Sequence, residues 1–134
     1  MKKPTCPYCK VPARFFASSA KFYNGRDYGP VYACEPCGAW VGCHKGTHNA
    51  LGRLANKELR AAKQLAHGAF DRLWQAKIRK EGLSKGRARK AGYTWLAIQM
   101  GIEVHRCHIG WMDLEECRRV VELCAPYHAE NRAA

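Results

Sequence analysis

The chain has 134 residues, the length of one ordinary domain or of two small units. Hydrophobic residues make up 47% of it, with four Trp, six Tyr and four Phe, so the composition supports a folded core and excludes a disordered chain. The formal net charge is +12 with histidine neutral. Such an excess favours a polyanionic partner such as nucleic acid, although some soluble proteins are basic without binding one.

The chain contains eight cysteines, which could form disulfides or bind metal. The first ten residues, MKKPTCPYCK, are basic but lack the apolar run of a secretory signal. No window approaches the ~18 apolar residues that a membrane span requires. We therefore expect a cytoplasmic protein with reduced thiols, and in that compartment paired cysteines usually bind metal.

The first part of the chain, residues 1–55, is predicted to form a small zinc-ribbon β unit. The pair Asn24-Gly25 is a strong turn signal between two segments rich in aromatic and β-branched residues. Gly, His and Thr then dominate residues 44–55, which indicates a loop. We expect strands over residues 13–23, 30–34 and 38–42.

The second part, residues 56–126, is predicted to be helical. Asn56, Ser84 and Asp113 each precede an apolar pattern of helical spacing and can cap its first turn. The expected helices end between Lys77 and Gly82, at Gly101, and near Pro126. Residues 102–112 are expected to form an extended connector, and residues 127–134 a frayed tail.

Together these elements predict an α+β fold in which a four-cysteine ribbon packs on about three helices, most simply as one compact domain. The strongest signal for it is the pair of motifs Cys6-x2-Cys9 and Cys34-x2-Cys37. Each motif can turn two thiolates toward one ion, and two such turns complete a tetrahedral zinc shell. Gly38 suits the tight turn that follows the second motif, whereas Lys10 occupies the equivalent position after the first. Redox-active CxxC pairs are the alternative, but they are typical of a βαβ context.

Further metal-binding residue types remain once one zinc ion has its four ligands. They define a possible second polar site composed of Cys43, His44, His67, Asp71 and His108. His67 and Asp71 lie four apart on one helix face, a spacing that suits a metal site or an oriented His–carboxylate pair. The alternative is structural: the histidines bond backbone carbonyls, and Cys117 and Cys124 are core residues seven apart on one stripe.

Residues 72–90 carry eight Lys or Arg and one acidic residue. This basic segment offers several phosphate donors between two helices, or else it is simply a solvated connector. Arg14, Lys21 and Arg26, with Tyr23 and Tyr28, could add a second contact with base stacking. No base-reading motif is recognisable, so strong sequence specificity is not expected. The candidate nucleic-acid-binding residues are Lys77, Arg79, Lys80, Lys85, Arg87, Arg89 and Lys90.

Several motifs occur in a distinctive order: CPYC, CEPCGAWVGCHKGT, LGRLANKELRAAKQLAHGAFDRLW, YTWLAIQMGI and CHIGWMDLEEC. In this order the chain resembles an uncharacterised zinc-finger-containing family of bacteriophages, prophages and bacteria, from about Cys6 to Cys124. The resemblance implies an intracellular protein of phage type in a bacterial host cell, with the four CxxC cysteines as metal ligands and no established activity. Lys10 departs from the pattern. The pattern also includes Cys43, His44, Gly46, Thr47, Arg60, His67, Asp71, Trp74, Trp95, His108 and Gly110.

Three functions fit these observations. The first is a zinc-binding accessory protein that contacts the phosphates of DNA or RNA. The second is a phage factor that binds and modulates a host protein, which predicts an exposed apolar patch near one of the tryptophans. The third is a metal-dependent, nuclease-like enzyme with a second metal, in which His44, His67 and His108 converge. The first is favoured, with one structural zinc ion as cofactor and no catalytic residue assigned.

Overall fold

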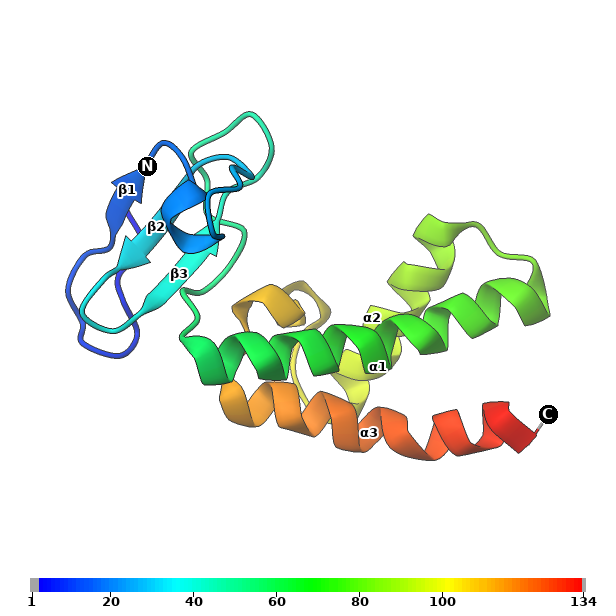
Figure 1. Ribbon diagram of the computed structural model, residues 1–134. Coiled ribbons are helices and arrows are strands. Elements are labelled where there is room, and N and C mark those ends of the chain that lie inside the picture. Colours follow the sequence, from blue (N-terminus) through cyan, green and yellow to red (C-terminus); the bar gives the residue numbers. More distant parts are fainter. Residues whose placement is uncertain (1–2, 134) are drawn as a thin grey trace. The chain divides into compact units, whose positions relative to one another are not determined.

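The computed structural model describes residues 3–133, and the side-chain surroundings of residues 3–128. The chain folds into two compact units, and the boundary between them lies between Arg60 and Ala61. The predicted boundary after residue 55 lies five residues earlier, and Arg60, in the first turn of α1, bonds to carbonyls of the ribbon unit. Figure 1 shows the sheet of the first unit and the helices of the second. None of the described helices is long and apolar enough to cross a membrane.

Three helices form the second unit: α1 (Lys57–Glu81), α2 (Lys85–Met100) and α3 (Leu114–Ala133). Helices α1 and α3 run in the same direction (Figure 1), and a hydrogen bond between His128 and Ala69 joins them. The core of this unit contains side chains that are at most 2% exposed: Phe70, Leu96, Cys107, Ile109, Met112, Cys117, Val120 and Cys124. The predicted core role of Cys117 and Cys124 is therefore confirmed, and both act as small apolar side chains.

Local capping chemistry sets the start of each helix as predicted. Asn56 Oδ1 accepts the N–H of the residue three positions later at 2.9 Å, and Ser84 Oγ does the same for α2 at 3.3 Å. Asp113 and Glu116 form a reciprocal capping box, with distances of 2.9 and 3.1 Å. Each bond satisfies a backbone donor that has no partner within its own helix.

The ends of α1 and α2 also match their prediction. Gly82 and Gly101 have φ values of +67° and +69°, the left-handed conformation in which helices commonly end. The Gly82 N–H donates to the carbonyl of Ile78 at 2.9 Å, which satisfies one of the last carbonyls of α1.

The predicted end of the third helix near Pro126 is wrong, because α3 continues to Ala133. Pro126 is exposed, so the carbonyl that loses its helical partner there can bond to water. Two residues later, the His128 Nε2 atom lies 2.8 Å from the carbonyl oxygen of Ala69 in α1. This contact stabilises the helical turn that follows the proline. Fraying of residues 127–134 stays a prediction, and Ala134 lies outside the described residues.

The predicted extended connector over residues 102–112 is also wrong. The chain there makes two 3₁₀ turns, Val104–Arg106 and Ile109–Trp111. Cys107, Ile109 and Met112 are all buried, and tight turns bring these closely spaced residues into one core. The turns also satisfy backbone donors, since Cys107 N–H bonds to Val104 at 3.0 Å.

The first unit contains a three-stranded antiparallel sheet in the order β1 (Arg14–Phe16), β2 (Val31–Cys34), β3 (Ala39–Gly42). The register places Phe15 opposite Tyr32 and Ala33 opposite Trp40. Ala55 pairs with the outer edge of β3 through two backbone bonds to Trp40 of 3.0 and 3.1 Å. The segment before α1 is thereby tied to the sheet.

Strand β1 is much shorter than the predicted strand over residues 13–23. After Phe16 the chain turns into a 3₁₀ helix, Ala20–Phe22. Ser19 is fully buried, and its hydroxyl accepts the Tyr28 N–H at 2.6 Å, while its own N–H donates to the carboxylate of Asp27 at 3.2 Å. These local side-chain bonds satisfy the backbone in place of a strand ladder.

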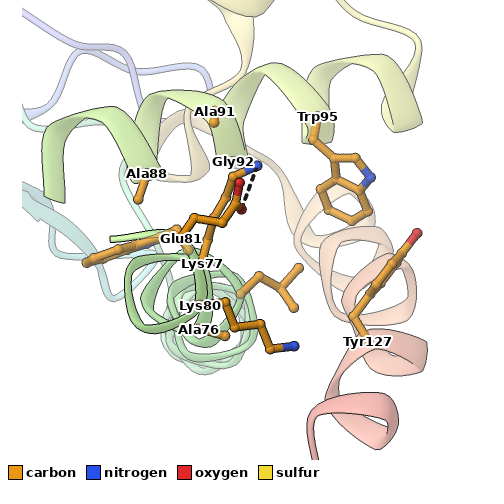
Figure 2. Close-up of a pocket in the computed structure, with 11 residues that line it drawn as sticks. Ala76, Lys77, Lys80, Glu81, Ala88, Ala91, Gly92, Trp95 and Tyr127 are labelled. Carbon is orange, nitrogen blue, oxygen red and sulfur yellow. Dashed lines mark ion pairs between the residues drawn. The ribbon is translucent and has the colours of Figure 1, made fainter. Parts of the chain in front are cut away.

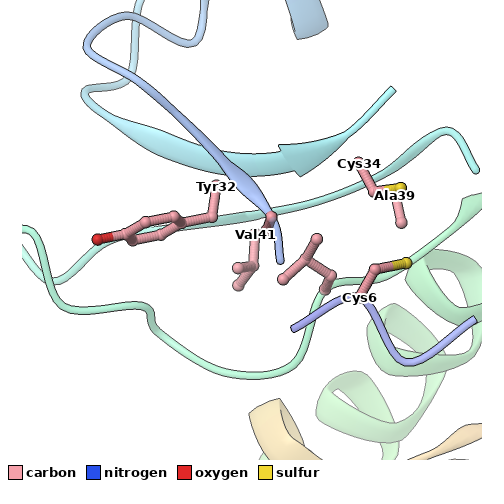
Figure 3. Close-up of a cluster of buried hydrophobic side chains, with 7 residues drawn as sticks. Cys6, Tyr32, Cys34, Ala39 and Val41 are labelled. Atoms are coloured by element: carbon pink, nitrogen blue, oxygen red, sulfur yellow. The ribbon is translucent and has the colours of Figure 1, made fainter. Parts of the chain in front are cut away.

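The ribbon has its own hydrophobic core, built around two of the cysteines. Figure 3 shows Tyr32, Cys34, Ala39 and Val41 from the sheet facing Cys6 from the N-terminal loop. Ala13 and Leu54 complete this buried cluster. The core is small because the strands are only three or four residues long. A unit with so little buried surface needs a further source of stability.

Candidate metal centre

Four cysteine sulfurs meet at one end of the ribbon. The ligand atoms of Cys6, Cys9, Cys34 and Cys37 all lie within 4.8 Å of one another, and the Cys9 and Cys34 sulfurs are 3.4 Å apart. A tetrahedral zinc ion with Zn–S bonds of about 2.3 Å holds its sulfurs about 3.8 Å apart, so the cluster has the right size for one ion. Within the described residues, no other group of three or more His, Cys, Asp and Glu side chains meets this condition.

The backbone of each CxxC motif forms the turn that points its two thiols inward. Cys6 bonds through its carbonyl to the Lys10 N–H and through its N–H to the Val11 carbonyl, both at 2.9 Å. The second turn is closed by the bond from the Gly38 N–H to Glu35 at 3.1 Å. Lys10 and Gly38 occupy equivalent positions, and both adopt positive φ, +66° and +61°. The departure from glycine at Lys10 therefore costs backbone strain, not a change of turn.

Substitution of Gly38 by Ala is expected to lower the free energy of unfolding of the zinc-loaded protein by about 1–2 kcal/mol, the cost of an L-residue in the left-handed region. An added Cβ there meets no atom within 4 Å, so the loss would be purely conformational. Lys10→Gly should act in the opposite direction, by less than 1 kcal/mol, because glycine also gains entropy in the unfolded chain. Denaturant titrations at saturating zinc measure both changes. An unchanged unfolding midpoint in Gly38→Ala would contradict the left-handed conformation of Gly38.

The four thiols differ in their environment. The Val11 N–H, followed by the thiols of Cys34 and Cys37, stabilises the Cys9 thiolate and lowers its pKa to about 7. The neighbouring thiols, Cys9 first, raise the pKa of Cys37 to about 12. One thiolate therefore suppresses ionisation of its neighbours until a cation neutralises them. Four thiolates around one ion leave no open coordination position, which defines a structural site, not a catalytic one.

Arg60 braces the second CxxC turn against the start of α1. Its guanidinium lies 3.4 Å from the centroid of the Trp40 ring. The same group donates to the carbonyl of Ala55 at 2.6 Å and to that of Gly38 at 3.4 Å. Burial lowers the pKa of Arg60, because removal from water disfavours its charged form, whereas the aromatic face attracts the cation.

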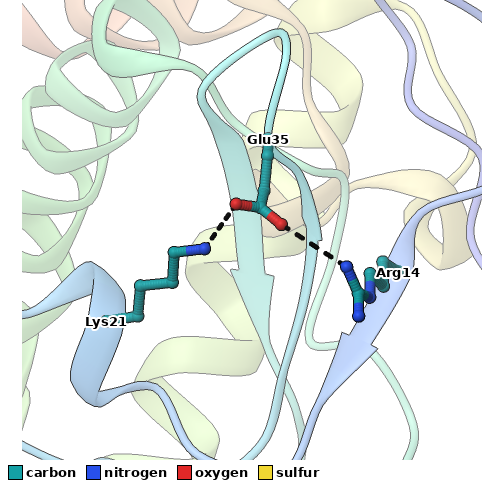
Figure 4. A network of polar contacts seen from close by, with 3 residues as sticks. All are labelled: Arg14, Lys21 and Glu35. Carbon is teal, nitrogen blue, oxygen red and sulfur yellow. Dashed lines mark hydrogen bonds and ion pairs between the residues drawn. The ribbon is translucent and has the colours of Figure 1, made fainter.

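Glu35, inside the second CxxC motif, holds two of the basic residues of the ribbon. Figure 4 shows its carboxylate between Lys21 and Arg14, and the Arg14 contact measures 3.8 Å. Lys21 is the main cause of the lowered pKa of Glu35. Exposed pairs of this kind add little stability, but they reduce the charge that Arg14 and Lys21 can offer to a phosphate.

The residues of the possible second polar site fall in both units. Cys43 and His44 belong to the ribbon unit, where Cys43 packs partly buried against the ribbon core. The N–H of His44 donates to the carbonyl of Asn49 at 2.8 Å, and its ring is exposed. Both residues thus open a hairpin-like loop, and Cys43 acts as an apolar side chain there.

His67, Asp71 and His108 belong to the helical unit. Burial is the main cause of the lowered pKa of His67, which the carboxylate of Asp71 partly opposes. Asp71 also accepts the indole N–H of Trp74 at 2.8 Å. His108, the third of these residues, lies near Tyr93, and the centroids of the two rings are 5.9 Å apart. A joint role for these three residues and the two in the ribbon stays a prediction.

The predicted nucleic-acid-binding residues occupy the end of α1 and the start of α2. All are exposed except the half-buried Lys77, whose Nζ lies 3.6 Å from the carboxylate of Glu81. Arg89 also approaches the Tyr93 ring, at 5.8 Å from its centroid. The structure thus presents the basic segment at a helix–turn–helix corner of the second unit.

A three-stranded ribbon that holds one zinc ion between two CxxC turns defines a zinc-finger protein of the ribbon class. A family described as a zinc-finger-containing domain matches residues 2–127, which is nearly the whole chain. The chain belongs to this family, as its motif order predicted. Comparison with curated proteins and with solved structures gives no significant match.

Proposed function

We propose that this protein binds nucleic acid through phosphate contacts, without strong sequence specificity, as an accessory protein of phage type. The observation that carries the proposal is the basic segment at the corner between α1 and α2. Its seven candidate residues surround a single acidic side chain, Glu81, which is paired with Lys77. The four zinc-bound thiolates and the divalent ion lower the formal charge of +12 by two, so a large positive excess remains.

The placement of charge on α2 supports a polyanionic partner. The first turn of this helix contains no acidic residue, whereas Lys85 and Arg87 lie at or near it. Cations at the positive end of a helix dipole are unfavourable by about 0.3–1 kcal/mol each. A phosphate backbone bound across this corner would reverse that cost. These cations make the start of α2 less stable, but they place positive charge where a polyanion can contact it.

The ribbon offers a smaller second surface. Tyr28 is 67% exposed and its ring stands edge-on to that of Tyr23, with centroids 5.0 Å apart. Arg26 lies between them in sequence and is exposed. Because Glu35 holds Arg14 and Lys21, we propose that the ribbon contributes stacking more than charge.

The proposal is tested by fluorescence anisotropy with labelled single-stranded and duplex oligonucleotides of mixed sequence between 50 and 200 mM salt. For five phosphate contacts, the plot of log affinity against log salt has a slope of about −3.5 on single strands and about −4.5 on duplex. Shuffling the sequence should leave the affinity unchanged. Absence of binding at 50 mM salt, or a slope near zero, would reject the proposal.

A protein partner is the second candidate, and one observation favours it. Trp111 is 52% exposed and Val104 46% exposed, and both lie in the 3₁₀ turns that precede α3. A protein partner would cover such side chains, and contiguous exposed apolar patches are typical of protein contact sites. Tight capture of a host protein that survives nuclease treatment and is lost in Trp111→Ala would support this function.

A further inference from the structure

The three helices of the second unit line an open cavity of about 300 Å³ beside the basic segment. Trp74 from α1, Trp95 from α2 and Tyr127 from α3 supply its aromatic lining. Figure 2 shows Trp95 and Tyr127 beside α1, on the side of the cavity opposite Lys77 and Ala76. Their ring planes meet at 86°, with centroids 5.3 Å apart, so they form two walls of a corner.

Small residues leave space beside these aromatic rings. Ala88, Ala91 and Gly92 line the side contributed by α2. At Gly92 the helices touch, because an added Cβ would lie 3.0 Å from the Phe70 ring. The bond from the Trp74 indole to Asp71 holds that side chain in place. The side of the cavity formed by Trp74 and Gly92 is therefore fixed by packing within one unit.

Positive charge borders the cavity. Lys77 and Lys80 belong to its lining, and Lys85 Nζ lies 5.9 Å from the centroid of the Trp74 ring. Glu81 is the acidic residue of the lining and is paired with Lys77. An apolar aromatic space beside several cations is complementary to a flat ring that carries a nearby negative charge. That combination describes a nucleotide, with its base and its phosphate.

We propose that this cavity receives one base of a single-stranded nucleic acid whose phosphates lie along the basic segment. The inference rests on the proposed function and adds a strand preference to it. The volume is at the lower end of ligand sites, which suits one planar group and not a folded peptide. Bases of a duplex are stacked inside the helix and cannot enter without being extruded, whereas those of a single strand are available.

The test uses a single-stranded oligonucleotide with one 2-aminopurine, a fluorescent base whose emission falls when it stacks on an aromatic ring. Trp95→Ala should weaken binding of this strand by about 5- to 140-fold, the range for one base–aromatic contact, and should abolish part of the quenching. Duplex affinity and the salt slope should stay unchanged. Trp111→Ala is the matched control, because Trp111 is an exposed tryptophan of the same unit that does not line the cavity.

A second variant covers the case in which Trp95→Ala destabilises the helical unit. Ala91→Trp fills the cavity from α2 without removing a core side chain, and it should cause the same selective loss for single strands. An equal loss on duplex, or no loss in either variant while the wild type still binds with a steep salt slope, would overturn the base pocket and leave the phosphate-binding proposal standing. A free mononucleotide that binds as tightly as the oligonucleotide would also overturn the assignment to a strand.

Discussion

Removal of the zinc ion is expected to unfold the ribbon unit and to leave the helical unit folded. Structural zinc contributes about 10–16 kcal/mol in zinc-finger peptides, whereas a unit of about 60 residues has only about 3–9 kcal/mol of net stability. The ribbon core is built around two metal ligands, Cys6 and Cys34. The core of the second unit contains no member of the four-cysteine cluster.

Cys9→Ser is the sharpest variant for this prediction, because Cys9 is exposed and its loss removes a ligand without removing core packing. Hydrogen exchange should become fast in β2 and β3 and stay slow in α2. Cys43→Ser is the matched control, since Cys43 is a ribbon cysteine outside the cluster, and it should retain one zinc ion per chain by mass spectrometry. A Cys9→Ser protein with a fully protected sheet would refute the role of the site. Two metal ions per chain in the wild type would support the nuclease-like alternative.

The same site should bind zinc more tightly as the pH rises from 6 to 8. In the folded ribbon the pKa of Cys37 is raised to about 12 and that of Cys34 is raised as well, and in an unfolded chain a cysteine thiol has a pKa of about 8.5, so both thiols are mostly protonated in this range before zinc binds. The Cys9 thiol, with a pKa of about 7, titrates within it. Zinc must displace these protons, and proton competition weakens binding at low pH. Competition with a chromophoric chelator at several pH values measures the effect, and a pH-independent affinity would contradict it.

Removal of three exposed charges from the basic segment is expected to have the second large effect. The triple variant Arg79→Ala, Arg87→Ala and Lys90→Ala should weaken nucleic-acid binding by about 10- to 100-fold, for up to about 1 kcal/mol for each exposed phosphate contact. It should also reduce the magnitude of the salt slope by about 2 to 3, since three fewer counterions are released. Arg89 is left in place because its guanidinium contacts the Tyr93 ring.

If net charge alone attracted nucleic acid, removal of any three basic residues would cause a similar loss of affinity. A control that removes three basic residues elsewhere is therefore needed. Lys45, Lys57 and Arg106 are exposed and lie outside the segment. Their joint replacement by Ala removes the same formal charge and should change the affinity only slightly. Equal losses in the two triple variants would show that the protein attracts nucleic acid by its overall charge, and would reject the basic segment as the binding surface.

The zinc ligands and most helix bounds could be predicted from the sequence because each depends on residues close together in the chain. A CxxC turn is closed by bonds within six residues, as Cys6 and Val11 show. The caps at Asn56, Ser84 and Asp113 act over three residues. Of the wrong predictions, the one for the end of the third helix concerns a segment that makes a contact with a distant part of the chain. His128 bonds to Ala69, 59 residues away in sequence, and this contact accompanies the helix beyond Pro126.

The sequence by itself therefore determined the class of the protein, its single zinc shell, the capped helices and the basic segment between two of them. Only the tertiary structure decided that Arg60 stacks on Trp40 and that Glu35 occupies Arg14 and Lys21. It alone placed Trp95 and Tyr127 around one cavity. Local motifs specify backbone bonds over a few residues. A cavity lined by three helices depends on how those helices pack against one another, and the periodicity of each helix does not specify that packing.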